Sequence, residues 1–281
     1  MADQPTPEQI LFAIQSSGYL MEQEVASVLE HLGLHVQTNR AFEDIEEGKS
    51  RELDVAAVRR VHFDEKNRIA VFVELLCECK NSRNPFAFLL RPTTVPDSNR
   101  KNEEIVLPQE FYHVRMKDKP NTMQRVDAID YLGIRPLHYG FGASLKAVQF
   151  AKIVREKGTW AANHSGLYDA IFYPLVKGLL ARKKEVAAFG GEWKYVWLFF
   201  PIVVTSGDLF VMNTADDPPT PTLTDSVTYV RHIKQGKIDG YFAVEFVTQS
   251  ALKRHVEEKI MPYAKAVGDL ARLHPEKYRE S

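Results

Sequence analysis

The residues of this chain that could do chemistry gather on two neighbouring apolar segments. The run IAVFVELLCECK, Ile69–Lys80, is mostly apolar but ends on Glu78, Cys79 and Lys80. The preceding segment RELDVAAVRRVHF carries Asp54. A carboxylate in such a setting is costly to keep charged unless a proton or a cation lies beside it. Glu78, Lys80 and Asp54 are therefore the first candidates for a functional site.

The two segments are typical of a β-hairpin, joined by the polar turn DEKN. If the turn is centred on Lys66, residues whose numbers sum to 132 face each other, which makes Asp54 and Glu78 direct cross-strand neighbours. Lys80 then projects from the same face as Glu78. Two carboxylates suit magnesium or manganese, and a lysine beside a metal-bound water or a phosphate suits phosphodiester hydrolysis.

A third acidic residue lies on the predicted helix YLMEQEVASVLEHL. Val25, Leu29 and Leu32 form an apolar stripe along this helix, and Glu22 falls on the stripe, so that it faces the core. A carboxylate on a buried face needs a partner, which a metal site or Lys80 would provide. The alternative is that Glu22 only satisfies the preference of a first helical turn for acids.

Together these positions resemble the PD-(D/E)xK nucleases, the restriction-endonuclease-like superfamily. That family carries a Glu on its first core helix, an Asp on one strand and Glu-x-Lys on the next, which here are Glu22, Asp54 and Glu78-Cys79-Lys80. The segments EQEVASVLEHLG, RELDVAA and ELLCECKN are similar to those of archaeal junction resolvases and of restriction enzymes that cut modified DNA. The resemblance runs from about Gly18 to Lys80, roughly a quarter of the chain.

The resemblance implies a four-stranded mixed sheet with helices on both faces. It also implies that Asp54 and Glu78, with Glu22 completing the set, hold magnesium or manganese, while Lys80 positions or activates the attacking water. Most members of the family act on DNA and some on RNA, and many form homodimers. The expected function is therefore a metal-dependent nuclease that hydrolyses phosphodiester bonds of DNA.

The order of elements along the chain predicts an α/β fold, with a mixed sheet of four to six strands flanked by helices. We expect one nuclease-like domain over residues 1–281, with an insertion at 81–142 and a C-terminal extension of one strand and one helix at 214–281. The segment SLKAVQFAKIVREKG is predicted as a helix, and YVWLFFPIVVTSG and DLFVMNT as a strand pair. The acidic stretch EDIEEGKS is predicted as a solvated loop.

Composition places few further limits on function. Hydrophobic residues make up 44% and charged residues 26%, and the net charge is −1, so no overall basic field indicates nucleic-acid binding. No apolar run reaches the ~20 residues that span a bilayer, and no signal pattern is present, so we expect a cytoplasmic protein without a membrane partner. Cys77 and Cys79 are expected to be buried thiols.

Basic residues near the predicted site are candidates for contact with nucleic acid. Arg83 follows Lys80 closely in a segment that also carries phenylalanines, and Arg182, Lys183 and Lys184 end a predicted helix. Cations are also common at helix C-termini for electrostatic reasons alone, which is the alternative for the second group. Lys80 likewise has a simpler alternative, an ion pair with Glu52 at the strand edge.

Two other hypotheses for the whole chain remain open at this point. The chain could be a non-catalytic module that binds nucleic acid or another partner and retains the nuclease fold. It could also have an unrelated α/β fold with a chance Glu-x-Lys, in which case the hairpin register would point Asp54 away from Glu78.

Overall fold

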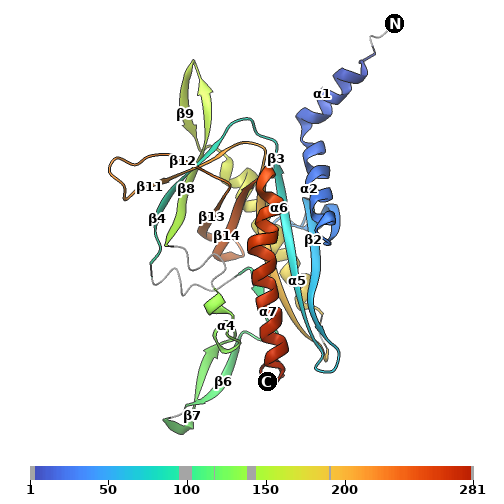
Figure 1. Cartoon of the computed structure of the whole chain (residues 1–281), viewed down its shortest axis with the longest axis vertical. Helices are drawn as coiled ribbons and strands as arrows, with labels where there is room; N and C mark the ends of the chain where they lie inside the picture. Colours follow the sequence, from blue (N-terminus) through green and yellow to red (C-terminus); the bar gives the residue numbers. More distant parts are fainter. Residues whose placement is uncertain (1–3, 95–102, 117, 138–143, 190, 280–281) are drawn as a thin grey trace.

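A twelve-stranded mixed sheet with helices on both faces forms the centre of the protein (Figure 1). The computed structural model describes residues 4–94, 103–116, 118–137, 144–189 and 191–279. In spatial order the sheet contains β1 (His35–Glu43), β2 (Ser50–Asp64), β3 (Ile69–Lys80), β10 (Lys194–Thr205), β14 (Ile238–Thr248), β13 (Ser226–Gln235), β8 (Leu145–Glu156), β4 (Phe86–Pro92), β11 (Leu209–Asn213) and β12 (Thr222–Thr224), with β5 (Ile105–Val106) on β10 and β9 (Thr159–Asn163) on β8. The α/β class is as predicted, but the sheet is larger than the expected four to six strands.

The helices begin and end close to the predicted positions. α1 (Pro7–Ser17) begins with a capping box between Thr6 and Gln9, and Gly18, at φ 91°, separates it from α2 (Tyr19–His31). The closing helix from Ala251 to Leu273 is confirmed as an almost continuous helical stretch. The remaining helices are α4 (Ala128–Tyr131), α5 (Tyr173–Ala187) after a π-turn at Tyr168–Phe172, and α6 (Leu252–His255), which passes through a π-turn at Val256–Ile260 into α7 (Met261–Leu273). None of the helices described is long and apolar enough to cross a membrane.

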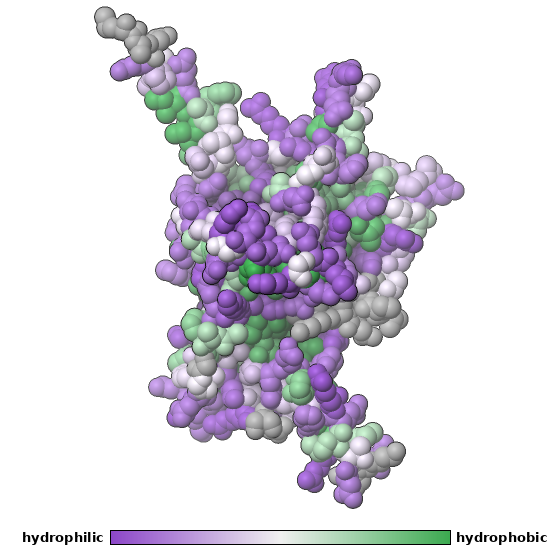
Figure 2. Space-filling model, turned by 180° about the vertical axis from the view of Figure 1, so that it is seen from behind, coloured by the Kyte–Doolittle hydropathy of each residue, from purple (hydrophilic) through white to green (hydrophobic). Residues whose placement is uncertain are grey.

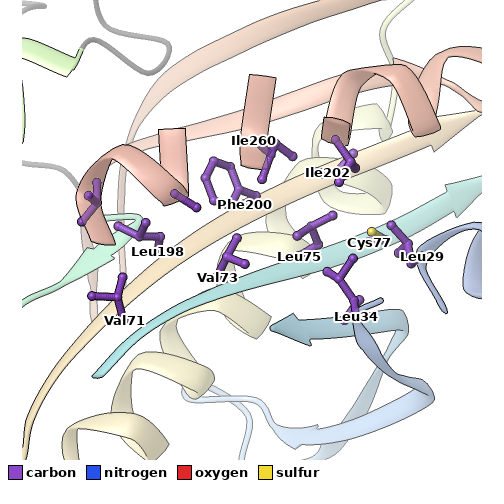
Figure 3. Packing of buried hydrophobic residues seen from close by; sticks show 14 of the residues in the cluster. Leu29, Leu34, Val71, Val73, Leu75, Cys77, Leu198, Phe200, Ile202 and Ile260 are labelled. Atoms are coloured by element: carbon purple, nitrogen blue, oxygen red, sulfur yellow. The ribbon is translucent and has the colours of Figure 1, made fainter. Parts of the chain in front are cut away.

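Strands β3 and β10 form the core of the sheet. They pair in parallel along their whole length, from Ile69 with Lys194 to Lys80 with Thr205. One face of the pair packs against α2 and against the C-terminal helical stretch, as Leu29 on α2 and Ile260 in the π-turn before α7 show in Figure 3. The other face packs against α5. Because both faces are covered, these strands are apolar almost without alternation, as expected for buried parallel strands.

The hairpin of β2 and β3 has the predicted register at the end nearest the site. Val55 pairs with Cys77, whose numbers sum to 132 as predicted. A bulge between Arg60 and His62 shifts the pairs nearer the turn by one residue. The ladder ends at the pair of Val55 and Cys77, so Asp54 and Glu78, one position further along, are close to each other but do not form the predicted cross-strand pair.

Several predicted elements differ in the structure. The predicted helix SLKAVQFAKIVREKG is instead β8, which pairs with β4, β9 and β13, and these three partners outweigh a modest helix propensity. The strands β10 and β11 both exist, but they are not paired with each other, since β11 pairs with β4 and β12. Within residues 81–142, strand β6 (Phe111–Met116) pairs with β7 (Lys119–Asp127), which leads directly into the short helix α4.

The two segments set apart on sequence grounds contribute to the main sheet. Residues 81–142, part of which lies outside the described residues, contain β4, while 214–281 contain β14, which pairs in parallel with β10. Helix α7 from the same C-terminal segment packs against β2 and β3.

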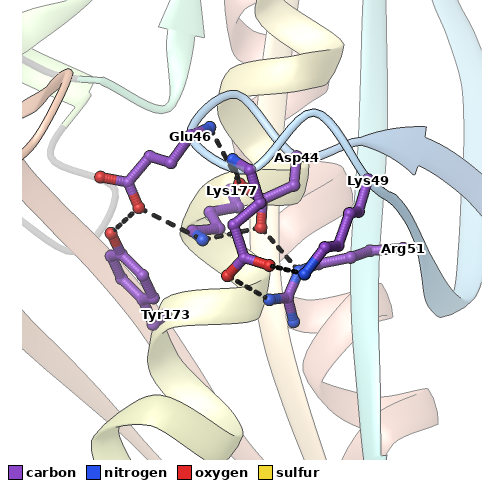
Figure 4. A network of polar contacts seen from close by, with 7 residues as sticks. Asp44, Glu46, Lys49, Arg51, Tyr173 and Lys177 are labelled. Atoms are coloured by element: carbon purple, nitrogen blue, oxygen red, sulfur yellow. Dashed lines mark hydrogen bonds and ion pairs between the residues drawn. The ribbon is translucent and has the colours of Figure 1, made fainter.

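The acidic stretch EDIEEGKS is not a fully solvated loop, because Asp44 is 0% exposed. Asp44 Oδ2 accepts hydrogen bonds from Lys177 Nζ at 2.7 Å and Arg51 Nε at 2.6 Å, and Glu46 binds Lys177 and Tyr173 (Figure 4). Burial raises the pKa of Asp44, but the hydrogen bonds from Lys177, from backbone N–H groups and from Arg51 outweigh it and lower the pKa. This network ties the β1–β2 loop to α5.

A second buried ion pair joins α5 to the centre of β3. Arg182 donates to both carboxylate oxygens of Glu74 at 2.8 Å, and the Glu74 side chain is 1% exposed. The bidentate geometry satisfies both oxygens inside the core. Glu74 is therefore an ion-pair partner of a helix rather than a cross-strand contact or a ligand.

We expect Arg182→Met to lower the free energy of unfolding by about 3 kcal/mol, because it removes the bidentate partner of the buried Glu74 carboxylate and leaves Arg40, at 3.5 Å from one oxygen, as the remaining counter-ion. Urea denaturation of the purified protein would measure it. The exposed neighbour Lys184, changed to Met, is the matched control and should alter stability by less than about 0.5 kcal/mol. Combining Arg182→Met with Glu74→Leu should recover most of the loss; equal losses for Arg182→Met and Lys184→Met would contradict this account.

Candidate active site

The candidate site lies at the C-terminal end of β3, beside the N-terminus of α2. Glu78 is 9% exposed, and its Oε1 accepts a hydrogen bond from Lys80 Nζ at 2.5 Å. Lys80 itself is half-buried. The predicted alternative paired Lys80 with Glu52, whereas the carboxylate that Lys80 contacts in the structure is Glu78.

Asp54 is held in place by an irregularity in β2. Leu53 and Val55 pack into opposite core layers, whereas residues two apart in a regular strand share a face, so the strand rotates at Asp54. The rotation lets Asp54 Oδ2 accept the backbone N–H of Cys79 at 2.6 Å. The side chain thus replaces a backbone carbonyl in the ladder and lies against β3 between Glu78 and Lys80.

Glu22 reaches the same region from the first turn of α2. Met21 and Val25 beside it are buried in the core and fix the rotation of the helix, and Glu22 is half-buried. The end of α1, which directly precedes α2, is tied to the end of β3, because Asn81 Nδ2 donates to the carbonyl of Gln15 at 2.6 Å.

The pKa values show that the three carboxylates interact with one another. Burial, together with the charges of Asp54 and Glu22, raises the pKa of Glu78 to about 7, although Lys80 opposes the shift. Burial also raises the pKa of Asp54, against the Cys79 N–H and Lys80. For Glu22, burial and then Asp54 raise the pKa. The acids predicted from sequence are therefore electrostatically one site, and one lysine does not neutralise it.

The two cysteines of β3 are free thiols. Cys77 is buried in the core and Cys79 is half-buried, and burial raises the pKa of both thiols. Neither thiol is therefore a nucleophile or a thiolate ligand at neutral pH.

The basic residues predicted to contact nucleic acid lie in two different regions of the structure. Arg83 is exposed in the loop that follows Lys80. Arg182 is buried against Glu74, and Lys183 contacts Glu103 at 2.5 Å. Lys184 is exposed, but it follows Arg182 along α5. Arg182 binds Glu74, which lies about 13 Å along β3 from Glu78, so this part of α5 is distant from the carboxylates. Of the four, only Arg83 lies at the same end of the sheet as the carboxylates.

A polar cleft beside the site was not predicted from the sequence. Its volume is about 810 Å³, and it lies at the C-terminal ends of β10 and β14. Ser206 connects it to the site, because its N–H donates to the Lys80 carbonyl at 3.2 Å. The wall from α2 includes Glu24, which accepts a hydrogen bond from Gln249 at 2.5 Å. No residue spacing marks this cleft, since it depends on the parallel pairing of strands far apart in sequence.

The donor set suits a hard cation only in part. Within the described ranges no group of three or more His, Cys, Asp or Glu side chains is placed to hold a metal ion. Magnesium is commonly held by one or two carboxylates together with waters and substrate oxygens. Among the described residues no hydrogen bond engages Asp54 Oδ1 or Glu78 Oε2, so one oxygen of each carboxylate is open to a cation.

Comparison of the chain with protein-family models, with curated proteins and with solved structures finds no match.

The raised pKa of Glu78 gives an expected pH dependence. A carboxyl group with a folded pKa of about 7 and a reference value of 4.5 binds its proton more tightly in the folded state. This tighter proton binding stabilises the folded state fully below pH 4.5, and the stabilisation is lost as the pH rises through 7. The loss in the free energy of unfolding is up to about 3 kcal/mol, at 1.36 kcal/mol per pKa unit. The Glu78→Gln variant lacks the titrating carboxyl group and is therefore the protein with which the wild type is compared.

Urea denaturation at pH 5 and pH 8 in EDTA would test it. Between these values the free energy of unfolding should fall by about 2–3 kcal/mol more in the wild type than in Glu78→Gln. Parallel pH profiles for the two proteins would mean that Glu78 is not perturbed.

Proposed function

We propose that the protein is a metal-dependent nuclease of the PD-(D/E)xK type, which hydrolyses phosphodiester bonds of DNA. The observation that carries this proposal is the set of mutually repelling carboxylates at the end of β3, with Lys80 hydrogen-bonded to Glu78. A carboxyl group such as Glu78, whose pKa is raised by burial and by neighbouring acids in a partly buried site, is typical of functional sites.

The arrangement of elements around the site supports the proposal. Helix α2, strands β1, β2 and β3, helix α5 and strand β10 follow one another in chain order and form a four-stranded mixed unit within the larger sheet. Its first three strands are antiparallel and β10 is parallel to β3, with α2 on one face and α5 on the other. A four-stranded mixed unit with helices on both faces is what the sequence resemblance leads us to expect, so this arrangement supports the proposal.

Each side chain has a role that its position allows. Asp54 Oδ1 and Glu78 Oε2 would hold magnesium or manganese, and Glu22 would complete the site through a water. When bound, the divalent ion supplies charge neutralisation and a water of lowered pKa. Lys80 keeps an ammonium group beside Glu78, where it can orient the attacking water or hold a phosphate oxygen. The Cys79 N–H fixes Asp54 and thereby the spacing of the ligands.

The alternative is a binding protein that retains this fold without its chemistry. The small number of acids placed to hold a metal favours it. Metal-dependent cleavage separates the two functions, because a protein that retains the fold without its chemistry would bind nucleic acid without hydrolysing it. A homodimer is compatible with either function.

We expect Mg²⁺- or Mn²⁺-dependent cleavage of DNA by the wild type, at least about 100-fold slower in Asp54→Asn and in Lys80→Met. Plasmid, single-stranded DNA and RNA would be incubated with each protein and resolved on gels. Both substitutions nearly preserve side-chain size, so circular dichroism should show folded protein. The matched control is Glu65→Gln, an exposed acid in the turn at the opposite end of the β2–β3 hairpin, which should cleave as the wild type does.

Calorimetry with Mn²⁺ provides a readout independent of turnover. Binding by the wild type that is lost in Asp54→Asn would support the metal site. Cleavage that persists in both Asp54→Asn and Lys80→Met would reject the assignment, and nucleic-acid binding without metal binding or cleavage would favour the binding-protein alternative.

A further inference from the structure

The hairpin of β8 and β9 projects from the same end of the sheet as the candidate site (Figure 1). Beyond its base it is exposed on both strands, with no buried residue from Lys152 to Asn163. It therefore makes no contribution to the core, although a two-stranded ribbon of this kind is only marginally stable by itself. Figure 2 shows the corresponding protrusion as largely hydrophilic.

The hairpin combines an exposed aromatic ring with positive charge. Trp160 is 65% exposed and pairs across the strands with Arg155. From Lys152 to Asn163 the segment carries three cations, Lys152, Arg155 and Lys157, against one anion, Glu156, so its net charge is +2 in a chain of −1. Within the described part of the chain, no ion pair engages these three cations.

The base of the hairpin is joined to the loop that follows the candidate site. Lys152 pairs with Phe86, and the N–H of Ile153 donates to the carbonyl of Pro85 at 2.8 Å. Pro85 is five residues after Lys80, which limits the distance along the chain to about 18 Å. Arg83 is exposed in this interval. Positive charge therefore continues from Lys80 through Arg83 to the hairpin.

We propose that the β8–β9 hairpin is a binding arm for single-stranded nucleic acid, with Trp160 stacking on a base and Lys152, Arg155 and Lys157 contacting phosphates. This inference rests on the proposed nuclease function for its orientation toward the site, but it makes a separate claim about binding.

The exposed indole selects single strands over intact duplex. A tryptophan face can stack only on a base that is not already stacked within a helix, and such stacking tolerates any sequence. The cations add affinity that depends on salt rather than on sequence. The chemistry that fits the arm is therefore an unpaired segment, whether an isolated strand or the end of a duplex.

Binding would be measured by fluorescence anisotropy of labelled oligonucleotides without divalent metal, so that turnover plays no part. We expect Trp160→Ala to weaken binding to a single-stranded 15-mer by about tenfold, and Trp160→Phe to weaken it less because the ring is retained. Duplex of the same sequence should bind more weakly to the wild type and lose little in Trp160→Ala. Arg155→Ala combined with Lys157→Ala should reduce the salt dependence of binding, with a slope smaller by about 1.4.

The matched control is Phe63→Ala. Phe63 is 47% exposed beside an arginine on the β2–β3 hairpin, where Arg60 lies 4.2 Å over its ring, but it is at the opposite end of β3 from the site. Its removal should leave oligonucleotide binding unchanged. Equal effects of Trp160→Ala and Phe63→Ala, or no effect of either, would overturn the binding arm.

The results separate this inference from the proposed nuclease. Cleavage by the wild type together with unchanged binding in Trp160→Ala would overturn the arm and leave the nuclease intact. Binding that depends on Trp160 without cleavage under any metal would support the arm and reject the nuclease. Absence of binding to any nucleic acid by the wild type would overturn the arm.

Discussion

The parallel pairing of β3 with β10 is the constraint on which the rest of the molecule depends. It runs from Ile69 to Lys80 without interruption and buries both faces of β3, so its apolar side chains connect the two core layers. Because the pairing carries on to Lys80, the polar end of β3 stays ordered and half-buried instead of fraying into solvent. The loops after β3 and β10 are held together by Ser206 and Asn81. The C-terminal ends of these two strands thereby position both the carboxylates and the neighbouring cleft.

Buried charges in this protein fall into two kinds. Glu74 and Asp44 are each surrounded by cations or donors, Arg182 in one case and Lys177 with Arg51 in the other, and the pKa of Asp44 is lowered accordingly. At the candidate site, burial and the charges of Asp54 and Glu22 raise the pKa of Glu78, burial and the charge of Glu52 raise the pKa of Asp54, and Lys80 opposes both shifts. The first kind stabilises the fold by satisfying its charges, whereas the second leaves negative charge unsatisfied. That difference is the physical reason for assigning function to the second group.

One end of the sheet collects the features that a substrate would meet. The carboxylates, the polar cleft, Arg83 and the β8–β9 hairpin all lie there, while the Arg182–Lys184 cluster points toward the other end. Parallel strands present their C-terminal ends on the same side, so residues distant in sequence gather at one edge. The edge combines negative charge at its centre with positive charge on its rim.

The sequence alone determined the local features of this protein. Apolar periodicity located α2, and the polar turn between the two apolar segments identified the hairpin that brings Asp54 close to Glu78, because each depends on residues close together in the chain. The bulge between Arg60 and His62 decided the exact register of that hairpin. Tertiary structure decided what depends on distant partners. Residues 145–156 are strand rather than helix because β4 and β13 offer them hydrogen bonds, and only this pairing carries Arg155 and Trp160 to the site end. Arg182 likewise gained its buried role from Glu74, a partner on another element that no local pattern could identify.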